Sequence, residues 1–183
     1  MGLSYYYFMA TLPGLRFGEA PPMTVRALLS RSEECLPADD HDVLAAAAVG
    51  DPAALAAPAM QCWNEWETGL RRVLAAARAA RLGRDASAYA DTSTLDTHTR
   101  AAVLDCSKLD DPLKAEQALD RLRWQFLDEL GATHVFDFTA ALSYLLKLTL
   151  LERWQQLDAA HGAAVLDRSV HARVGTTMEE SPA

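Results

Sequence analysis

Histidines and aspartates lie close together at two places in the chain, as they would in a metal site. His134 and Asp137 are three residues apart, and His41 lies among the three aspartates of residues 39–42. Imidazole and carboxylate groups are metal ligands. However, Asp137 falls at a predicted helix start, where an aspartate caps the helix. The other three aspartates fall in a predicted first turn, where the helix dipole favours negative charge. We therefore predict a cap and a solvent-facing cluster, with no metal or cofactor.

Two further pairs could bind a substrate or do chemistry on it. Glu65 and Glu67 could act as paired carboxylates, but two residues apart on a predicted helix they do not face each other. We expect both on the surface. Trp63 and Trp66 could stack a base or a sugar. Because a spacing of three on an amphipathic helix is typical of one buried face, we assign the pair to the core or to an interface.

Lys147 interrupts the most apolar stretch of the chain, FTAALSYLLKLTLL at residues 138–151. We expect its stem to cover apolar surface while the ammonium group reaches water or pairs with a carboxylate. A catalytic lysine would need a companion site. The sequence has no nucleotide-binding GxGxxG or GxxxxGK[ST] pattern, no GxSxG nucleophile elbow and no HExxH metal motif. We predict no catalytic residue, and an unfamiliar site around Lys147, His134 and Asp137 remains the enzyme alternative.

Composition and charge narrow the classes of partner. The chain has 183 residues and a net charge of −8, which argues against nucleic acid as the main partner because phosphate binding needs a basic stripe. Its three cysteines form no CxxC pair, as expected for reduced thiols in the cytosol. The first ten residues do not read as a signal peptide. The longest apolar stretch is shorter than the ~20 residues of a bilayer span. We predict a cytoplasmic protein without direct membrane insertion, which a membrane-bound complex could recruit through protein contacts.

The elements that must position these residues are predicted to be helices. Alanine and leucine dominate the apolar residues, and β-branched residues are few. We predict an all-α, single-domain bundle of about six helices over residues 1–174, with a disordered acidic tail at 175–183. An aromatic extended arm is expected at 4–12. The expected helices span residues 24–36, 37–49, 58–82, 95–107, 112–130 and 137–161, with a final short helix at 163–172.

The last long helix is apolar around much of its circumference, so it must be covered on several sides. The cover can come from the other helices, from a partner or from a second copy of the chain. Six side chains form the candidate interaction surface: Trp63, Trp66, Tyr144, Lys147, Leu151 and Trp154.

Two segments resemble a known family: SYYYFMATLPGL at residues 4–15, and RWQFLDELGATHVFDFTAALSYLLKLTLLERWQQLDAAHG at residues 123–162. The family comprises short uncharacterised bacterial proteins that are encoded beside the subunits of V-type ATPase/ATP synthases. The second segment is also similar to the C/d (central stalk) subunit of those enzymes. Residues 51–109 show no family motif.

The resemblance implies a non-catalytic accessory or central-stalk-like component, held to V-type ATP synthase subunits through protein contacts. It brings no catalytic residues with it. The alternative hypothesis is a general helical interaction protein or homodimer unrelated to the ATPase.

Overall fold

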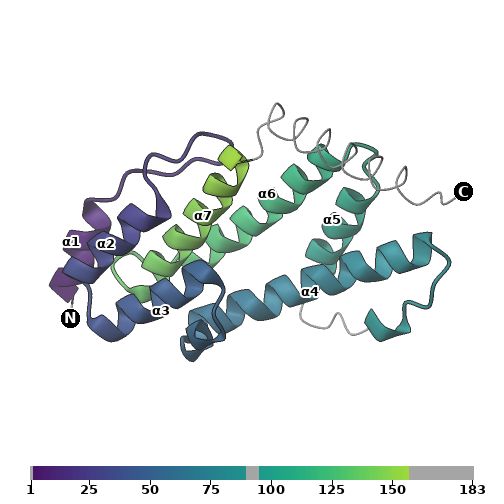
Figure 1. Cartoon of the computed structure of the whole chain (residues 1–183). Helices are drawn as coiled ribbons and strands as arrows, with labels where there is room; N and C mark the ends of the chain where they lie inside the picture. Colours follow the sequence, from purple (N-terminus) through teal and green to yellow (C-terminus); the bar gives the residue numbers. More distant parts are fainter. Residues whose placement is uncertain (1, 90–94, 157–183) are drawn as a thin grey trace, which may run out of the picture.

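The computed structural model describes residues 2–89 and 95–156 (Figure 1). Within those ranges the chain forms α-helices and short 3-10 helices and no strand, so the all-α prediction is confirmed. The helices are α1 (Gly2–Ala10), α2 (Val25–Cys35), α3 (Ala38–Val49), η1 (Pro52–Ala56), α4 (Pro58–Arg81), η2 (Ser87–Tyr89), α5 (Thr97–Ser107), α6 (Pro112–Gly131) and α7 (Phe138–Gln156).

Several predictions concern residues beyond the described part of the chain. These are the end of the last long helix, the short helix at 163–172, the domain boundary at 174 and the tail at 175–183. Among the helices that the structure describes, none combines the length and the apolar character needed to cross a membrane.

The helices begin where the sequence places their caps. Thr24 Oγ1 accepts a hydrogen bond from Ala27 N at 3.1 Å, and Asp111 Oδ1 accepts one from Leu113 N at 2.9 Å. Asp137 Oδ1 accepts from Ala140 N at 3.0 Å, which satisfies one of the free amides at the start of α7. These side chains therefore set the starts of α2, α6 and α7.

The predicted extended arm is wrong, because residues 2–10 form helix α1. Tyr5 and Phe8, one helical turn apart, are both buried against the bundle, whereas Tyr6 and Tyr7 are exposed. Tyr5 also donates a hydrogen bond from its hydroxyl to Asp40 Oδ2 at 2.6 Å. Aromatic residues are only mildly unfavourable in a helix, so the burial of one helical face outweighs their preference for strands.

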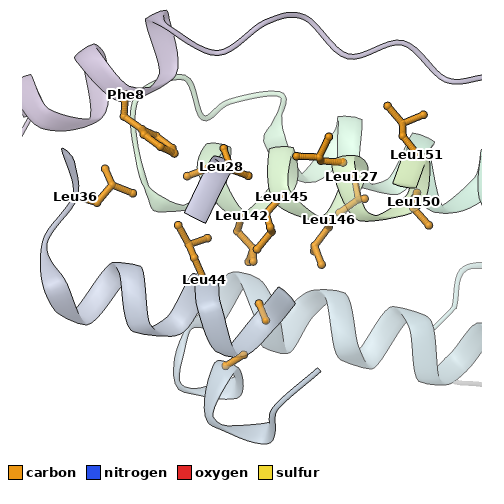
Figure 2. Close-up of a cluster of buried hydrophobic side chains, with 14 of the residues drawn as sticks. Phe8, Leu28, Leu36, Leu44, Leu127, Leu142, Leu145, Leu146, Leu150 and Leu151 are labelled. Atoms are coloured by element: carbon orange, nitrogen blue, oxygen red, sulfur yellow. The ribbon is translucent and has the colours of Figure 1, made fainter. Parts of the chain in front are cut away.

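Helix α7 is the centre of the first hydrophobic cluster (Figure 2). It packs against α1, α2, α3, α4 and α6. Its leucines meet Phe8, Leu28, Leu44 and Leu127, all of which are almost fully buried. The side chains that α7 exposes are Thr149, Arg153, Gln155 and Gln156. The other helices therefore supply most of the cover that this apolar helix needs.

A second hydrophobic cluster lies between α4, α5 and α6, and includes Trp66, Leu70, Val103 and Leu119. Helix α6 lies between α7 and α5 (Figure 1), and it contributes side chains to both clusters. Leu119 on α6 belongs to the second cluster, whereas Trp124 and Leu127 on the same helix belong to the first.

Candidate interaction groove

A groove of about 450 Å³ runs between the α1–α2 connection, the end of α6 and one face of α7. It is lined by Met9, Leu12, Pro13, Gly14, Leu15, Trp124, Asp128, Gly131, Ala132, His134, Val135, Ala140, Ser143, Tyr144 and Lys147. Its volume falls within the range of ~300–1,000 Å³ typical of ligand pockets.

All the lining residues of this groove come from residues 4–15 or 123–162. These are the two segments whose sequences carry the resemblance described above. They are joined directly, since the Tyr144 hydroxyl donates a hydrogen bond to the Pro13 carbonyl oxygen at 2.8 Å. Two stretches more than a hundred residues apart in the chain therefore form the walls of one surface feature.

Lys147 lies on the α7 wall of the groove. Its ammonium nitrogen is 2.5 Å from Asp128 Oδ1 and 5.5 Å from the centre of the Trp124 ring. Only 16% of the side chain is exposed, while Asp128 is mostly in solvent. The predicted arrangement of a covered stem and a carboxylate partner is confirmed.

Ser143 lies one helical turn before Lys147 on the same wall. It is 4% exposed, and its hydroxyl has no hydrogen-bond partner among the described residues. Gly131 faces it from the end of α6, where an added Cβ would lie 3.6 Å from Ser143 Oγ. A buried hydroxyl without a partner costs roughly 1–3 kcal/mol, so the groove wall holds an unmet polar group.

Two titratable side chains complete the polar part of the groove. Burial raises the pKa of Tyr144 to about 12, so its hydroxyl stays protonated and able to donate. His134 Nδ1 donates to Asp137 Oδ2 at 2.5 Å. Desolvation raises the pKa of Asp137, but the hydrogen bonds from Ala140 N and His134 outweigh it and hold that pKa below its ordinary value.

An exposed apolar rim adjoins the groove at the turn between α6 and α7. Val135, which lines the groove, is 60% exposed, and its neighbour Phe136 is 42% exposed. The Phe136 ring lies 4.8 Å from the ring of Tyr6 on α1, which is also exposed. Groove and rim together form one continuous surface of mixed polar and apolar character.

A network of buried charges lies elsewhere, between α4, α6 and α7. Arg123 donates from Nε and Nη2 to the two oxygens of Glu67, each at 2.9 Å, and from Nη1 to Asp120 at 2.7 Å. Desolvation lowers the pKa of Arg123, but Glu67 and Asp120 outweigh it and raise that pKa above its ordinary value. The guanidinium is therefore charged and fully engaged with its partners.

Asp120 is the most deeply buried member of this network, with no exposed surface. It also accepts hydrogen bonds from Arg153 and, at 2.7 Å, from the indole nitrogen of Trp154. Because both carboxylates are paired and hydrogen-bonded, we assign the network to holding α4 and α7 against α6.

The surface position expected for Glu67 is wrong, because the residue is only 7% exposed, whereas Glu65 is exposed as predicted. The helical pattern of α4 gave no signal for a buried carboxylate. Its partner Arg123 lies 56 residues further along the chain. Asp120 and Arg123, three residues apart on α6, were the available signal.

The six predicted interaction residues do not lie on one surface. Tyr144 and Lys147 line the groove. Trp66 is buried, and its ring stacks on Phe126 at 4.6 Å and on Trp63 at 5.8 Å. Leu151 is 2% exposed. It lines, with the half-buried Trp154, a separate cleft of about 420 Å³ next to Phe17.

The solvent-facing cluster around His41 is only partly as expected. Asp39 and Asp42 are exposed. His41, however, is half-buried, with Nδ1 2.8 Å from the hydroxyl of the fully buried Ser32. Asp40 is half-buried too, as the acceptor of Tyr5. Across residues 2–89 and 95–156, no group of three or more His, Cys, Asp or Glu residues is placed to hold a metal ion.

Comparison with known proteins matches part of the chain to a protein family. Neither the curated proteins nor the solved structures include a match to this chain. The match is to a family whose description names no activity, partner or complex. The match covers α5, α6 and α7, and hence the larger wall of the groove, but not residues 4–15. Residues 98–173 are similar to the family described as a protein of unknown function (DUF2764).

Proposed function

We propose that this chain is a non-catalytic accessory or central-stalk-like component of a bacterial V-type ATP synthase, held to the complex by protein contacts. The proposal begins with the resemblance of residues 4–15 and 123–162 to proteins encoded beside that enzyme. The observation that carries it furthest is the meeting of these two segments around a single groove.

The composition of this surface suits protein recognition. Protein interfaces are enriched in aromatic residues and contain a few well-placed polar groups. The groove and its rim present Tyr6, Val135 and Phe136 beside Lys147 and Tyr144. The same features support the alternative of a helical interaction protein or homodimer unrelated to the ATPase.

The polar side chains gathered in the groove are what would favour an enzyme. However, Lys147 is paired with Asp128, and His134 with Asp137. Within the described residues no hydrogen bond joins the Ser143 hydroxyl to either of them. A nucleophile activated by a neighbouring base needs such a contact. The arrangement therefore favours binding over covalent catalysis.

The proposal is tested by purifying the V-type ATP synthase from its native membranes through a tag on another subunit. Mass spectrometry then measures the ratio of this chain to the complex before and after a salt wash. We expect a constant ratio in the assembled complex. A purified, active complex without this chain, with the chain recovered alone or as a dimer, would contradict the proposal.

A further inference from the structure

The groove combines features that specify the chemistry of what it binds. We propose that it binds a peptide segment of a partner protein in which an acidic side chain lies close to an apolar or aromatic one. The acidic group pairs with Lys147, and the apolar group packs on the rim formed by Tyr6, Val135 and Phe136. The inference rests on the proposed function only in taking the partner to be a protein.

The position of the Lys147 ammonium group indicates that the bound segment carries an acidic side chain. The Lys147 side chain is 16% exposed and its ammonium nitrogen lies 5.5 Å from the centre of the Trp124 ring, while the Asp128 side chain is 58% exposed. An ammonium group has three donors, and Asp128 Oδ1 takes one of them. A second carboxylate approaching along the groove can therefore bind the same ammonium while Asp128 stays in solvent.

The Ser143 hydroxyl indicates that the bound segment also carries a hydrogen-bonding group. Ser143 is 4% exposed, and its buried hydroxyl has no hydrogen-bond partner in the described part of the chain. A backbone or side-chain polar group inserted between the end of α6 and α7 would satisfy it. A buried polar group that gains a partner only in the complex favours the complex.

The apolar side chain follows from the rim. Val135, Phe136 and Tyr6 are each at least 42% exposed; Val135 lines the groove, and the Phe136 ring next to it contacts the ring of Tyr6. Aromatic groups on a partner can pack on these rings and gain from ring–ring contact as well as from burial. A nucleic acid fits poorly, since the groove offers a single paired lysine rather than a basic stripe.

The test uses the full chain and a phage-displayed library of random twelve-residue peptides, because the partner segment is unidentified. Enriched peptides are synthesised, and their dissociation constants are measured by fluorescence anisotropy. We expect the enriched peptides to contain Asp or Glu beside an aliphatic or aromatic residue. Enrichment of basic or uncharged peptides, or of none, would overturn the inference.

Two groove variants test where the peptides bind, and a third variant, outside the groove, serves as the matched control. Lys147→Met and Val135→Asp are each expected to raise the dissociation constant at least about tenfold, which is ~1.4 kcal/mol. Lys108→Met changes the same residue type in an exposed pair with Asp105 that does not line the groove, and should change binding less than about twofold. Unchanged binding in both groove variants would overturn the inference. Because Val135 is exposed, its variant should keep the fold, which circular dichroism checks.

The two proposals can fail separately. If the chain does not copurify with the ATP synthase but binds acidic–apolar peptides through Lys147, only the proposed function falls. If it copurifies and the groove variants keep their peptide binding, only this inference falls. Light scattering tests whether a second copy of this chain occupies the groove. A dimer that dissociates with Val135→Asp would assign the groove to self-association and overturn the inference.

Discussion

The buried charge network and the groove both place charged side chains against apolar surface, but their charged groups are partnered differently. In the network between α4, α6 and α7, Glu67 and Asp120 each accept several hydrogen bonds from arginines or an indole. In the groove, Lys147 pairs with a solvent-exposed aspartate. The hydroxyl of Ser143, one turn away, has no hydrogen-bond partner among the described residues. Among the described residues, every charged side chain of the network has a partner, whereas the Ser143 hydroxyl of the groove has none.

The difference separates a structural role from a binding role. Buried charges that are paired and hydrogen-bonded fix the helices that carry them, and removing one partner leaves an uncompensated charge. We propose that the groove, with the Ser143 hydroxyl unpartnered among the described residues and the Lys147 ammonium group paired with an exposed aspartate, gains further contacts from a bound segment. We therefore expect variants of the network to lose stability, and variants of the groove to lose binding while stability changes little.

The largest effect is expected from Arg123→Met. The substitution leaves Glu67 and Asp120 buried without their shared cation, which should destabilise the fold by roughly 3–5 kcal/mol. Urea unfolding followed by circular dichroism measures it. Arg71→Met is the matched control, because Arg71 pairs with the same Glu67 but is 74% exposed. That variant should cost less than about 1 kcal/mol, and equal losses in the two would remove the distinction between buried and exposed partners.

Ser143→Ala should change stability in the opposite direction. Removing an unpartnered buried hydroxyl should stabilise the fold by about 1 kcal/mol, since alanine keeps the apolar contacts of the side chain. Thermal unfolding of the free protein measures the change. A loss of stability would show that the hydroxyl has a partner in solution, and the contrast between groove and network would weaken.

The stability contributed by Asp137, at the turn between α6 and α7, should fall as the pH is lowered. The folded-state pKa of Asp137 is lowered, so its carboxylate contributes stability above its unfolded pKa, and this is lost as pH falls through the folded pKa. Asparagine still caps a helix but does not titrate. The stability advantage of the wild type over Asp137→Asn, below about 1 kcal/mol, should therefore shrink on acidification. Thermal melts of both proteins from neutral pH downward test this, and a constant difference would contradict it.

The smallest stability effect is expected from Lys147→Met. Methionine keeps the apolar stem, and the lost ion pair involves an exposed aspartate, so the cost should stay below about 1 kcal/mol. Urea unfolding beside Arg123→Met provides the direct comparison. A loss as large as that of Arg123→Met would make Lys147 part of the structural framework and would contradict its role in binding.

The fold was largely predictable from local signals. Thr24, Asp111 and Asp137 mark helix starts, and each makes the capping hydrogen bond that its residue type predicts. The central position of residues 138–151 follows from their apolar character on all sides. The segment at 4–12 was misassigned because strand preference is a weak guide when one helical face can be buried.

The site was only partly predictable. Lys147 was recognisable as an ion inside an apolar helix, and Tyr144 as part of a contact surface. The groove itself depends on the turn at Pro13 meeting α7, a contact across 131 residues that no local pattern records. The network pairs Glu67 with Arg123 across 56 residues, and amphipathic periodicity assigns charged residues to the surface by default.

Photo-cross-linking tests most directly whether this chain contacts the proposed V-type ATP synthase complex through the groove. A photoreactive amino acid replaces either Val135 at the groove or Arg78 on the exposed face of α4, in the native cell. We predict a cross-link from position 135 to a V-type ATP synthase subunit, and none from position 78. Cross-links from position 78 alone, or none from 135 while the chain still copurifies with the complex, would contradict the account.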